Sequence, residues 1–305
     1  MKKSQKMTAI MARLTTFIVA AVVAAAAVTA TSCAGKKSGA GVRIGSKDFT
    51  ENLILAEVYA LALENAGIPA ERKFALASSV VHTTLVNNEI DLYPEYTGTG
   101  LLSVLKLGLE TDPQKVYRIV KEQYLQKFKL VWLDYAQAND GQGLAIAKRA
   151  ADEYGIRTIS DLQRNAEKIR FASQGEFDVR EDALPMLAKV YGPFNWKSSV
   201  VYANALKYQV LQQDEADVAP AYTTEGQLAG GGFVLLADDK AAWPPYNIAP
   251  VVRQEVLDKY PKIAGVLNAV NAKIDTPTIT ALNAQVDIDK QEYEDVARAF
   301  FDRIK

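Results

Sequence analysis

The sequence predicts an α/β protein of two lobes, and three observations support this fold class. The opening residues alternate between strand and helix patterns. A thirteen-residue segment at 85–97 recurs at 211–223 with six identical positions. Two irregular stretches, near 135–139 and 236–243, separate the halves. Because alternating strands and helices are typical of parallel sheets covered by helices, we expect one such sheet in each half.

Elements of the first half follow from the apolar pattern. We expect strands at 42–45, 72–76 and 130–133 and helices at 79–88 and 113–127. Another helix follows the first strand, and Asp48 with Glu51 predicts a capping box at its start. It ends near Asn65, where Gly67 and Pro69 follow.

The second half predicts strands at 143–147, 169–172 and 200–202. Helices are expected at 159–166, 180–191 and 205–213, and four more form the tail at 254–260, 263–270, 276–287 and 290–304. We therefore assign residues 42–137 and 243–305 to lobe one and residues 138–242 to lobe two. The tail helices pack on lobe one, and hinge bending at the crossings closes a cleft around a ligand.

Each copy of the repeated segment is expected to end a helix and to continue through Glu-x-Asp into a short apolar strand that stops at a proline. A tyrosine and a threonine then follow at the carboxyl end of the strand. Ligands in open α/β sheets collect outside the carboxyl ends of the strands. Tyr96 and Tyr222 are therefore expected to face each other across the cleft. A second interpretation is a recurring helix–strand connection in which both tyrosines are ordinary half-buried aromatics.

Residues 1–32 predict a secretory signal, with four basic residues before an apolar run. Cys33, the only cysteine, stands where cleavage is expected, so we predict a lipidated cysteine and a tether over residues 33–41. The product is an exported, membrane-anchored lipoprotein facing the periplasm or the cell exterior. Plain signal cleavage is the alternative.

Composition excludes several classes of function. Residues 33–305 hold 31 Lys and Arg against 36 Asp and Glu, a net charge of −5, with no basic stripe for nucleic acid. His82 is the only histidine, which leaves no histidine-rich metal site, and Gly230–Gly232 lacks the residues of a P-loop. Glu95 and Glu225 could form a glycosidase pair, but no spacing distinguishes them from loop acids. We therefore expect no enzyme activity, no metal and no cofactor.

Tyrosines in loops that face the predicted cleft give the strongest clue to function. The faces of Tyr96, Tyr222 and Tyr246 would attract a quaternary ammonium, each contact contributing roughly 0.5–2 kcal/mol once water is excluded. Lys47 before a helix, Arg180 at the start of another, and the Thr99 hydroxyl could hold a carboxylate. Together they predict a site for a small zwitterion. Taken singly, each charged group is also compatible with a surface charge or a cap.

Four segments resemble one family. They are G-S-K-D-F-T-E at 45–51, D-L-Y-P-E-Y-T-G-T-G at 91–100, E-F-x-x-R at 176–180 and W-P-P-Y-N-x-A-P at 243–250. The chain is similar over these segments to the substrate-binding proteins of glycine betaine/carnitine/choline ABC importers. The resemblance implies a type II periplasmic-binding-protein fold and a tyrosine cage around a trimethylammonium group. It places the cage on Tyr96, Tyr222 and Tyr246, and the carboxylate-binding lysine, threonine and arginine on Lys47, Thr99 and Arg180.

One departure from the family pattern concerns the ligand. Members commonly carry Asn-Asp-Thr-Tyr before lobe two, whereas this chain has Asn139, Asp140, Gly141 and Gln142, with glutamine in place of the cage tyrosine. One ring fewer costs about 1 kcal/mol toward a trimethylammonium, and an amide adds a donor and an acceptor. The ligand is then a larger or more polar betaine or amine, such as ergothioneine, or else Gln142 points away and the site binds betaine weakly.

The resemblance also implies partners. We expect a monomer that delivers its ligand to an ABC permease. Two other classes remain open: a sensory module that works without a transporter, and a hydrolase built on the same two lobes.

Overall fold

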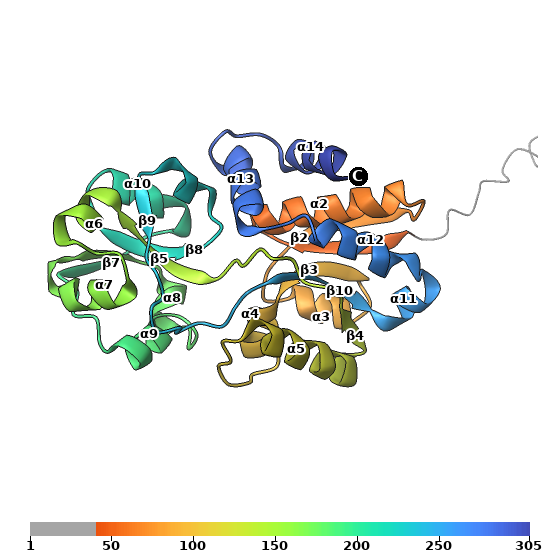
Figure 1. Cartoon of the computed structure of the whole chain (residues 1–305), viewed down its shortest axis with the longest axis horizontal. Helices are drawn as coiled ribbons and strands as arrows, with labels where there is room; N and C mark the ends of the chain where they lie inside the picture. The colour runs from red at the N-terminus through yellow and green to blue at the C-terminus, as the bar shows by residue number, and fades with distance from the viewer. Residues whose placement is uncertain (1–40) are drawn as a thin grey trace, which may run out of the picture. The chain divides into compact units, whose positions relative to one another are not determined.

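A computed structural model of the chain describes residues 41–305 (Figure 1). Helices and strands form two α/β lobes, each around a five-stranded sheet, which confirms the predicted fold class. The predicted signal and Cys33 lie outside the described residues. Across residues 41–305 no helix is both long and apolar enough to cross a membrane.

The sheet of lobe one has the order β2-β1-β3-β10-β4. Its strands are Ala70–Leu76, Val42–Lys47, Leu92–Tyr96, Ile248–Arg253 and Leu130–Trp132. β1 runs parallel to β2 and β3, whereas β10 is antiparallel to β3 and β4. In Figure 1, α2 (Thr50–Asn65) and α12 (Lys262–Asn271) lie on one face, and α3 (Val81–Val86) and α5 (Pro113–Phe128) on the other. α11 (Gln254–Lys259) precedes α12, and α14 (Tyr293–Ile304) packs on α2.

The sheet of lobe two has the order β7-β6-β8-β5-β9. Its strands are Ser198–Val201, Arg170–Ser173, Val218–Tyr222, Gln142–Ala147 and Phe233–Leu235. β6 is parallel to β7 and β8, and β5 is antiparallel to β8 and β9. The helices around it are α6 (Lys148–Tyr154), α7 (Ile159–Asn165), α8 (Gly175–Val179), α9 (Leu184–Tyr191) and α10 (Lys207–Gln212). Both sheets are therefore mixed, although the sequence predicts parallel ones.

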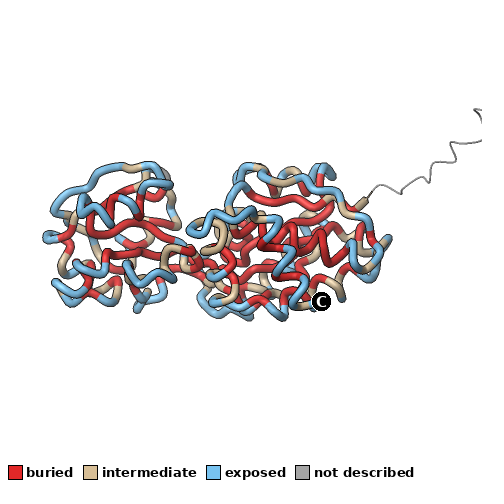
Figure 2. The backbone as a smooth tube through the Cα atoms, turned by 90° about the horizontal axis from the view of Figure 1, so that it is seen from above, coloured by how far each residue is buried: buried red, intermediate tan, exposed pale blue. Residues whose placement is uncertain are grey.

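Buried residues form the interior of both lobes, as the red segments in Figure 2 show. In lobe one, Tyr93, Tyr124 and Trp132 are fully buried in one cluster. His82 packs edge-on against Tyr124 and Phe128, and burial lowers its pKa. The only histidine is therefore a half-buried residue that packs against this cluster.

Each copy of the repeated segment joins a helix to a strand, α3 to β3 and α10 to β8. Asp91 accepts hydrogen bonds from the backbone N–H (2.8 Å) and the Nε (3.0 Å) of Arg43 in β1. Asp217 does the same with Arg170 in β6, at 2.9 Å for both. The aspartate of each copy therefore fastens its strand to the parallel neighbour, a structural role that the second interpretation anticipates.

The prediction that these strands stop at their prolines is wrong. β3 and β8 continue through Pro94 and Pro220 to Tyr96 and Tyr222. The parallel ladder is already finished at each proline, because β3 pairs with β1 only at Leu92 and β8 pairs with β6 only at Val218. A proline, which has no N–H, breaks no ladder bond at such a position.

Several local predictions are corrected. The capping box is absent: α2 begins after Phe49 with no side-chain cap. The helix predicted at 180–191 begins only at Leu184, as α9, and Arg180 lies between it and the end of α8, a short helix that the sequence does not predict. Proline in the first turn of α9 suits a helix start rather than a helix interior. The sequence prediction also lacks α6, β9, β10 and the helical turns α4 (Thr97–Thr99) and η2 (Gly100–Val104).

Two crossings connect the lobes and contact each other. Asn139 and Asn247 form an isolated antiparallel bridge. The Asn247 amide donates to the carbonyls of Ala136 and Ala138, both at 3.2 Å. The tail helix α13 (Thr276–Asp287) also contacts η5 (Gly226–Gly230) of lobe two. The tail helices therefore do not pack on lobe one alone, contrary to the prediction.

Candidate ligand-binding site

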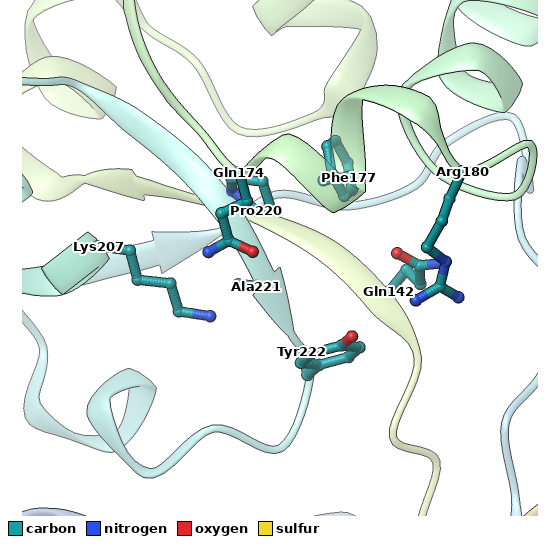
Figure 3. Close-up of a pocket in the computed structure, with 8 residues that line it drawn as sticks. All are labelled: Gln142, Gln174, Phe177, Arg180, Lys207, Pro220, Ala221 and Tyr222. Atoms are coloured by element: carbon teal, nitrogen blue, oxygen red, sulfur yellow. The ribbon is translucent and has the colours of Figure 1, made fainter. Parts of the chain in front are cut away.

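A small cavity of about 30 Å³ opens at the end of β8 in lobe two. Its wall combines two cationic side chains, two amides and two aromatic rings (Figure 3). The lining residues are Gln142, Gln174, Phe177, Arg180, Lys207, Pro220, Ala221 and Tyr222. Three of them, Gln142, Arg180 and Tyr222, are site residues that the sequence predicts.

Arg180 and Gln142 share one acidic partner. The Nε and one Nη of Arg180 donate to the two carboxylate oxygens of Asp182, at 2.9 and 2.7 Å. These hydrogen bonds raise the pKa of Arg180. The Gln142 amide donates to the Asp182 carbonyl at 3.1 Å and to its carboxylate at 3.2 Å. Asp182 therefore fixes both donors at the wall of the cavity and balances the charge of the guanidinium.

Tyr222 and Gln142 face each other in the register of β8 and β5. Tyr222 is 41% exposed at the end of its strand. The ammonium of the buried Lys207 lies 5.8 Å from the centroid of this ring and is ion-paired with Glu225. The Tyr222 ring thus contacts the ammonium of Lys207, while much of the Tyr222 surface remains accessible to solvent.

Tyr246 is buried at the second crossing. Its backbone N–H donates to the Asn139 side chain at 2.6 Å, and its ring packs so closely on Gly98 that an added Cβ would lie 2.7 Å from it. Burial raises the pKa of Tyr246, and the nearby Asp182 carboxylate raises it further. Among the described residues its hydroxyl has no hydrogen-bond partner. A buried hydroxyl without a partner is costly, so this is a position that a polar ligand atom would satisfy.

Tyr96 takes part in a separate set of contacts in lobe one. Its hydroxyl donates to Glu51 at 2.9 Å, and its ring lies under the Lys47 ammonium, 4.7 Å from the centroid. That ammonium is 2.5 Å from Glu95, so Lys47 is neutralised within the protein. Thr99 is half-buried at the end of α4.

Asn139 and Asp140 do not line the cavity; their side chains accept hydrogen bonds from other residues of the protein. The Asn139 side chain accepts from the backbone of Tyr246. Asp140 accepts from Thr224 at 2.7 Å and is buried close to the Glu51 carboxyl. Burial raises the pKa of Asp140 and of Glu51, and the proximity of the two carboxyls raises that of Asp140 further.

The predicted site residues therefore fall into two groups. Gln142, Arg180, Tyr222 and Tyr246 gather around the cavity of lobe two, with Asp182 between them. Lys47 and Tyr96 lie with Glu51 and Asp140. Sequence reasoning missed Asp182, Lys207 and Gln174, because nothing in their local sequence marks them as site residues. Within residues 41–305 no cluster of histidine, cysteine and carboxylate side chains could hold a metal.

Known proteins resemble the whole described part of the chain. Residues 40–303 match the model of the substrate-binding domain of ABC-type glycine betaine transport systems. The glycine betaine-binding protein YehZ of Escherichia coli is 32% identical over 84% of this chain and 88% of its own length. The glycine-betaine-binding protein of Pseudomonas aeruginosa is 33% identical over 88% of this chain and 89% of its own.

A third relative binds another compound. The ergothioneine transport permease/ergothioneine binding protein EgtU of Helicobacter pylori is 33% identical over 86% of this chain. The present chain spans only 47% of that protein's length.

Solved structures agree in fold. A glycine betaine/carnitine/choline ABC transporter structure superposes with a TM-score of 0.78 at 26% identity, covering 86% of this chain and 98% of the other. The apo structure of E. coli YehZ gives 0.70 at 31% identity, covering 87% and 98%. The chain belongs to the family of substrate-binding domains of ABC-type glycine betaine transport systems, as its four motifs indicate.

Proposed function

We propose that this chain binds a small zwitterion with a methylated ammonium group outside the cytoplasm and delivers it to an ABC permease. One observation carries the proposal: the cavity of lobe two places an accessible tyrosine face beside cations that are each neutralised by a carboxylate. Since the pairs Arg180–Asp182 and Lys207–Glu225 balance, the wall favours a ligand without net charge.

The proposed contacts divide between the ends of the ligand. Tyr96, Tyr222 and Tyr246 surround the cation, and Lys47, Thr99 and Arg180 hold the carboxylate. The arrangement around the cavity supports the roles of Tyr222 and Arg180 most directly, since both line it. For Tyr96 and Lys47 the role requires a rearrangement, because the Lys47 ammonium lies over the Tyr96 ring and is itself paired with Glu95.

A second candidate ligand is a larger and more polar betaine such as ergothioneine. The buried Tyr246 hydroxyl, which has no partner among the described residues, favours it. The hydroxyl could donate to the carboxylate of either ligand, but only an imidazole N–H, which glycine betaine lacks, could also donate to its oxygen. The glutamine in place of a cage tyrosine and the ergothioneine-binding relative support the same class.

Calorimetry with a panel of ligands tests the proposal. We expect glycine betaine, proline betaine, carnitine or ergothioneine to bind, choline to bind more weakly because it lacks the carboxylate, and common amino acids not to bind. Tyr222→Ala should weaken binding roughly twofold to thirtyfold, the equivalent of about 0.5–2 kcal/mol, and Tyr222→Phe much less, because the ring face supplies the attraction. No binding of any methylated amine, or equal losses in the two variants, would contradict the proposal.

Anchoring and partners belong to the same proposal. Cys33 is lipidated and tethers the protein to the outer side of the membrane, where it meets its permease as a monomer. Cys33→Ala should release the protein from the membrane fraction of its host. Growth on the transported compound with the permease deleted would favour the sensory or scavenging class, and turnover of the ligand by the purified protein would favour a hydrolase.

A further inference from the structure

Lys207 is an unusual residue for a cavity wall because it is a lysine that is only 4% exposed. Its ammonium is ion-paired with Glu225, whose other oxygen accepts from the Tyr208 hydroxyl. The same ammonium lies 5.3 Å from the centroid of the Tyr208 ring and 5.8 Å from that of Tyr222. Lysine is almost never fully buried unless it is paired, so this cluster holds together as a unit.

Lobe one contains a cluster of the same composition. The Lys47 ammonium is 2.5 Å from Glu95 and 4.7 Å from the Tyr96 ring, and Glu95 accepts from the Tyr93 hydroxyl at 2.7 Å. The two clusters are not copies of one motif, because Lys47 ends strand β1 whereas Lys207 begins helix α10. Two independent sequence positions thus place a neutralised lysine against a tyrosine that ends a strand.

We propose that Lys207 and Glu225 are a positioning pair for Tyr222, and that their charge balance makes the cavity selective for a quaternary ammonium group over an uncharged carbon group of the same shape. The inference rests on the proposed function of Tyr222 in cation binding. The ammonium of Lys207 lies over one face of the Tyr222 ring, and in the proposed complex the ligand binds at the opposite face. Glu225 cancels a positive charge that would otherwise repel that ligand through the ring.

The size of the effect follows from geometry. Lys207 Nζ lies 5.8 Å from the ring centroid, and a ligand ammonium binds within about 6 Å on the other side, so roughly 10 Å separates the charges. At an effective dielectric constant near 20, an uncompensated lysine at that distance weakens cation binding on the order of tenfold.

Two probes of the same shape isolate this effect. Glycine betaine and 3,3-dimethylbutanoate differ in a nitrogen or a carbon at the centre of the methyl groups, so the ratio of their Kd values cancels the contribution of the carboxylate. Calorimetry on Glu225→Gln should show the preference for glycine betaine reduced on the order of tenfold. The double variant Lys207→Met/Glu225→Gln should regain most of the preference that Glu225→Gln loses, because neither charge remains, but not all of it, because the ring has lost the pair that positions it.

Two further variants separate position from charge. Lys207→Arg keeps a cation against the ring, and we expect the preference to stay within about twofold of the wild type. Asp152→Asn removes the acidic partner that Lys148 and Arg157 share on the exposed side of α6 in the same lobe, away from the cavity. It should leave the ratio unchanged, because solvent screens exposed charges. An equal loss of both probes in Glu225→Gln, or an unchanged ratio, overturns the inference.

A measurement without ligand distinguishes failure of this inference from failure of the proposed function. If the wild-type protein binds neither probe, the proposed function fails for betaine, and the placement of Lys207 is still tested by NMR. Ring currents of Tyr208 and Tyr222 should shift the ε-methylene protons of Lys207. Tyr222→Leu should reduce that shift, and a shift that does not change would show that Lys207 does not position Tyr222.

Discussion

Gly98 leaves room for the ring of Tyr246, and a single methyl group would remove that room. A Cβ on residue 98 would lie 2.7 Å from the ring, closer than a side chain tolerates. Gly98→Ala should therefore displace Tyr246 and weaken binding of glycine betaine roughly tenfold, at a stability cost of about 1–3 kcal/mol. Calorimetry and urea unfolding measure the two effects. Gly108→Ala is the matched control, since no atom lies within 4 Å of its added Cβ; equal effects of both variants would contradict this role of Gly98.

The buried pair of Glu51 and Asp140 should make stability depend on pH. Burial raises the pKa of both carboxyls, so the folded state holds their protons more tightly than the unfolded state does. Their contribution is then fully present below the unfolded pKa values near 4 and is lost as pH rises through the folded values. The neighbouring charges are Glu225, which raises the pKa of Asp140 further, and Lys47, which lowers it.

Asp140→Asn tests this pair because the amide keeps an oxygen to accept the Thr224 hydroxyl. Urea unfolding at pH 4 should show little difference from the wild type, since Asp140 is protonated in that folded state. At pH 8 the variant should be the more stable protein, because no carboxylate has to be buried or protonated. Parallel stability curves from pH 4 to pH 8 would show that the carboxyls do not share a buried environment.

At the scale of elements, the aspartates of the repeated segment should carry much of the stability of each sheet. Asp217 accepts from Arg170 and Arg149, and although burial opposes ionisation, these partners lower its pKa to about 2. Asp217→Asn should therefore lower the free energy of unfolding on the order of 2–3 kcal/mol at pH 7. The wild type should lose this difference as pH falls from about 4 through 2, where the folded carboxylate takes up its proton.

A neighbouring aspartate supplies the control for that prediction. Asp214 also pairs with Arg149 and Arg170, but its side chain is 62% exposed. Asp214→Asn should cost less than about 1 kcal/mol, because exposed ion pairs contribute little. If the two variants lose equal stability in urea, the burial of Asp217 does not explain its contribution to the free energy of unfolding.

Local signals explain which elements the sequence predicts well. Helix α5 begins at Pro113 and is capped by Asp112, whose side chain accepts from the third residue of the helix at 2.8 Å. α13 has the same arrangement with Asp275. β10 escapes prediction because Pro250 at its centre argues against a strand. Its pairing with β3 and β4 overrides that local preference.

The site is predictable only where function leaves a mark within a short segment. Tyr222 and Arg180 stand in motifs that the sequence displays, and the structure places both at the cavity. Asp182 and Lys207 acquire their roles from partners distant in sequence: Gln142 is 40 positions from Asp182, and Glu225 is 18 from Lys207. A single sequence does not reveal such pairs, because the acid or base of a buried pair looks the same in the sequence as an acid or base exposed on the surface.

For the whole molecule, the arrangement of crossings and tail determines how the lobes are linked. The crossings contact each other through Asn139 and Asn247. Helix α13 adds a third link, since Asn283 donates to the Thr224 carbonyl at 2.9 Å and Gly226 lies against the backbone of Ala284. A Cβ on Gly226 would lie 2.6 Å from that backbone. Movement of the lobes must therefore carry α13 along or separate it from η5.

This linkage leads to a prediction about where a ligand stabilises the protein. Glycine betaine at a hundred times its Kd should add about 2.7 kcal/mol to the free energy of unfolding. If the ligand contacts both lobes, amide hydrogen exchange should slow in residues 94–99 of lobe one and in residues 218–225 of lobe two. Helix α5, which lies on the far side of the first sheet from α2, serves as the reference for the protection that global stabilisation alone produces. Protection confined to lobe two would mean that its cavity binds the ligand alone and that Tyr96 and Lys47 have only the structural roles seen in their contacts with Glu51 and Glu95.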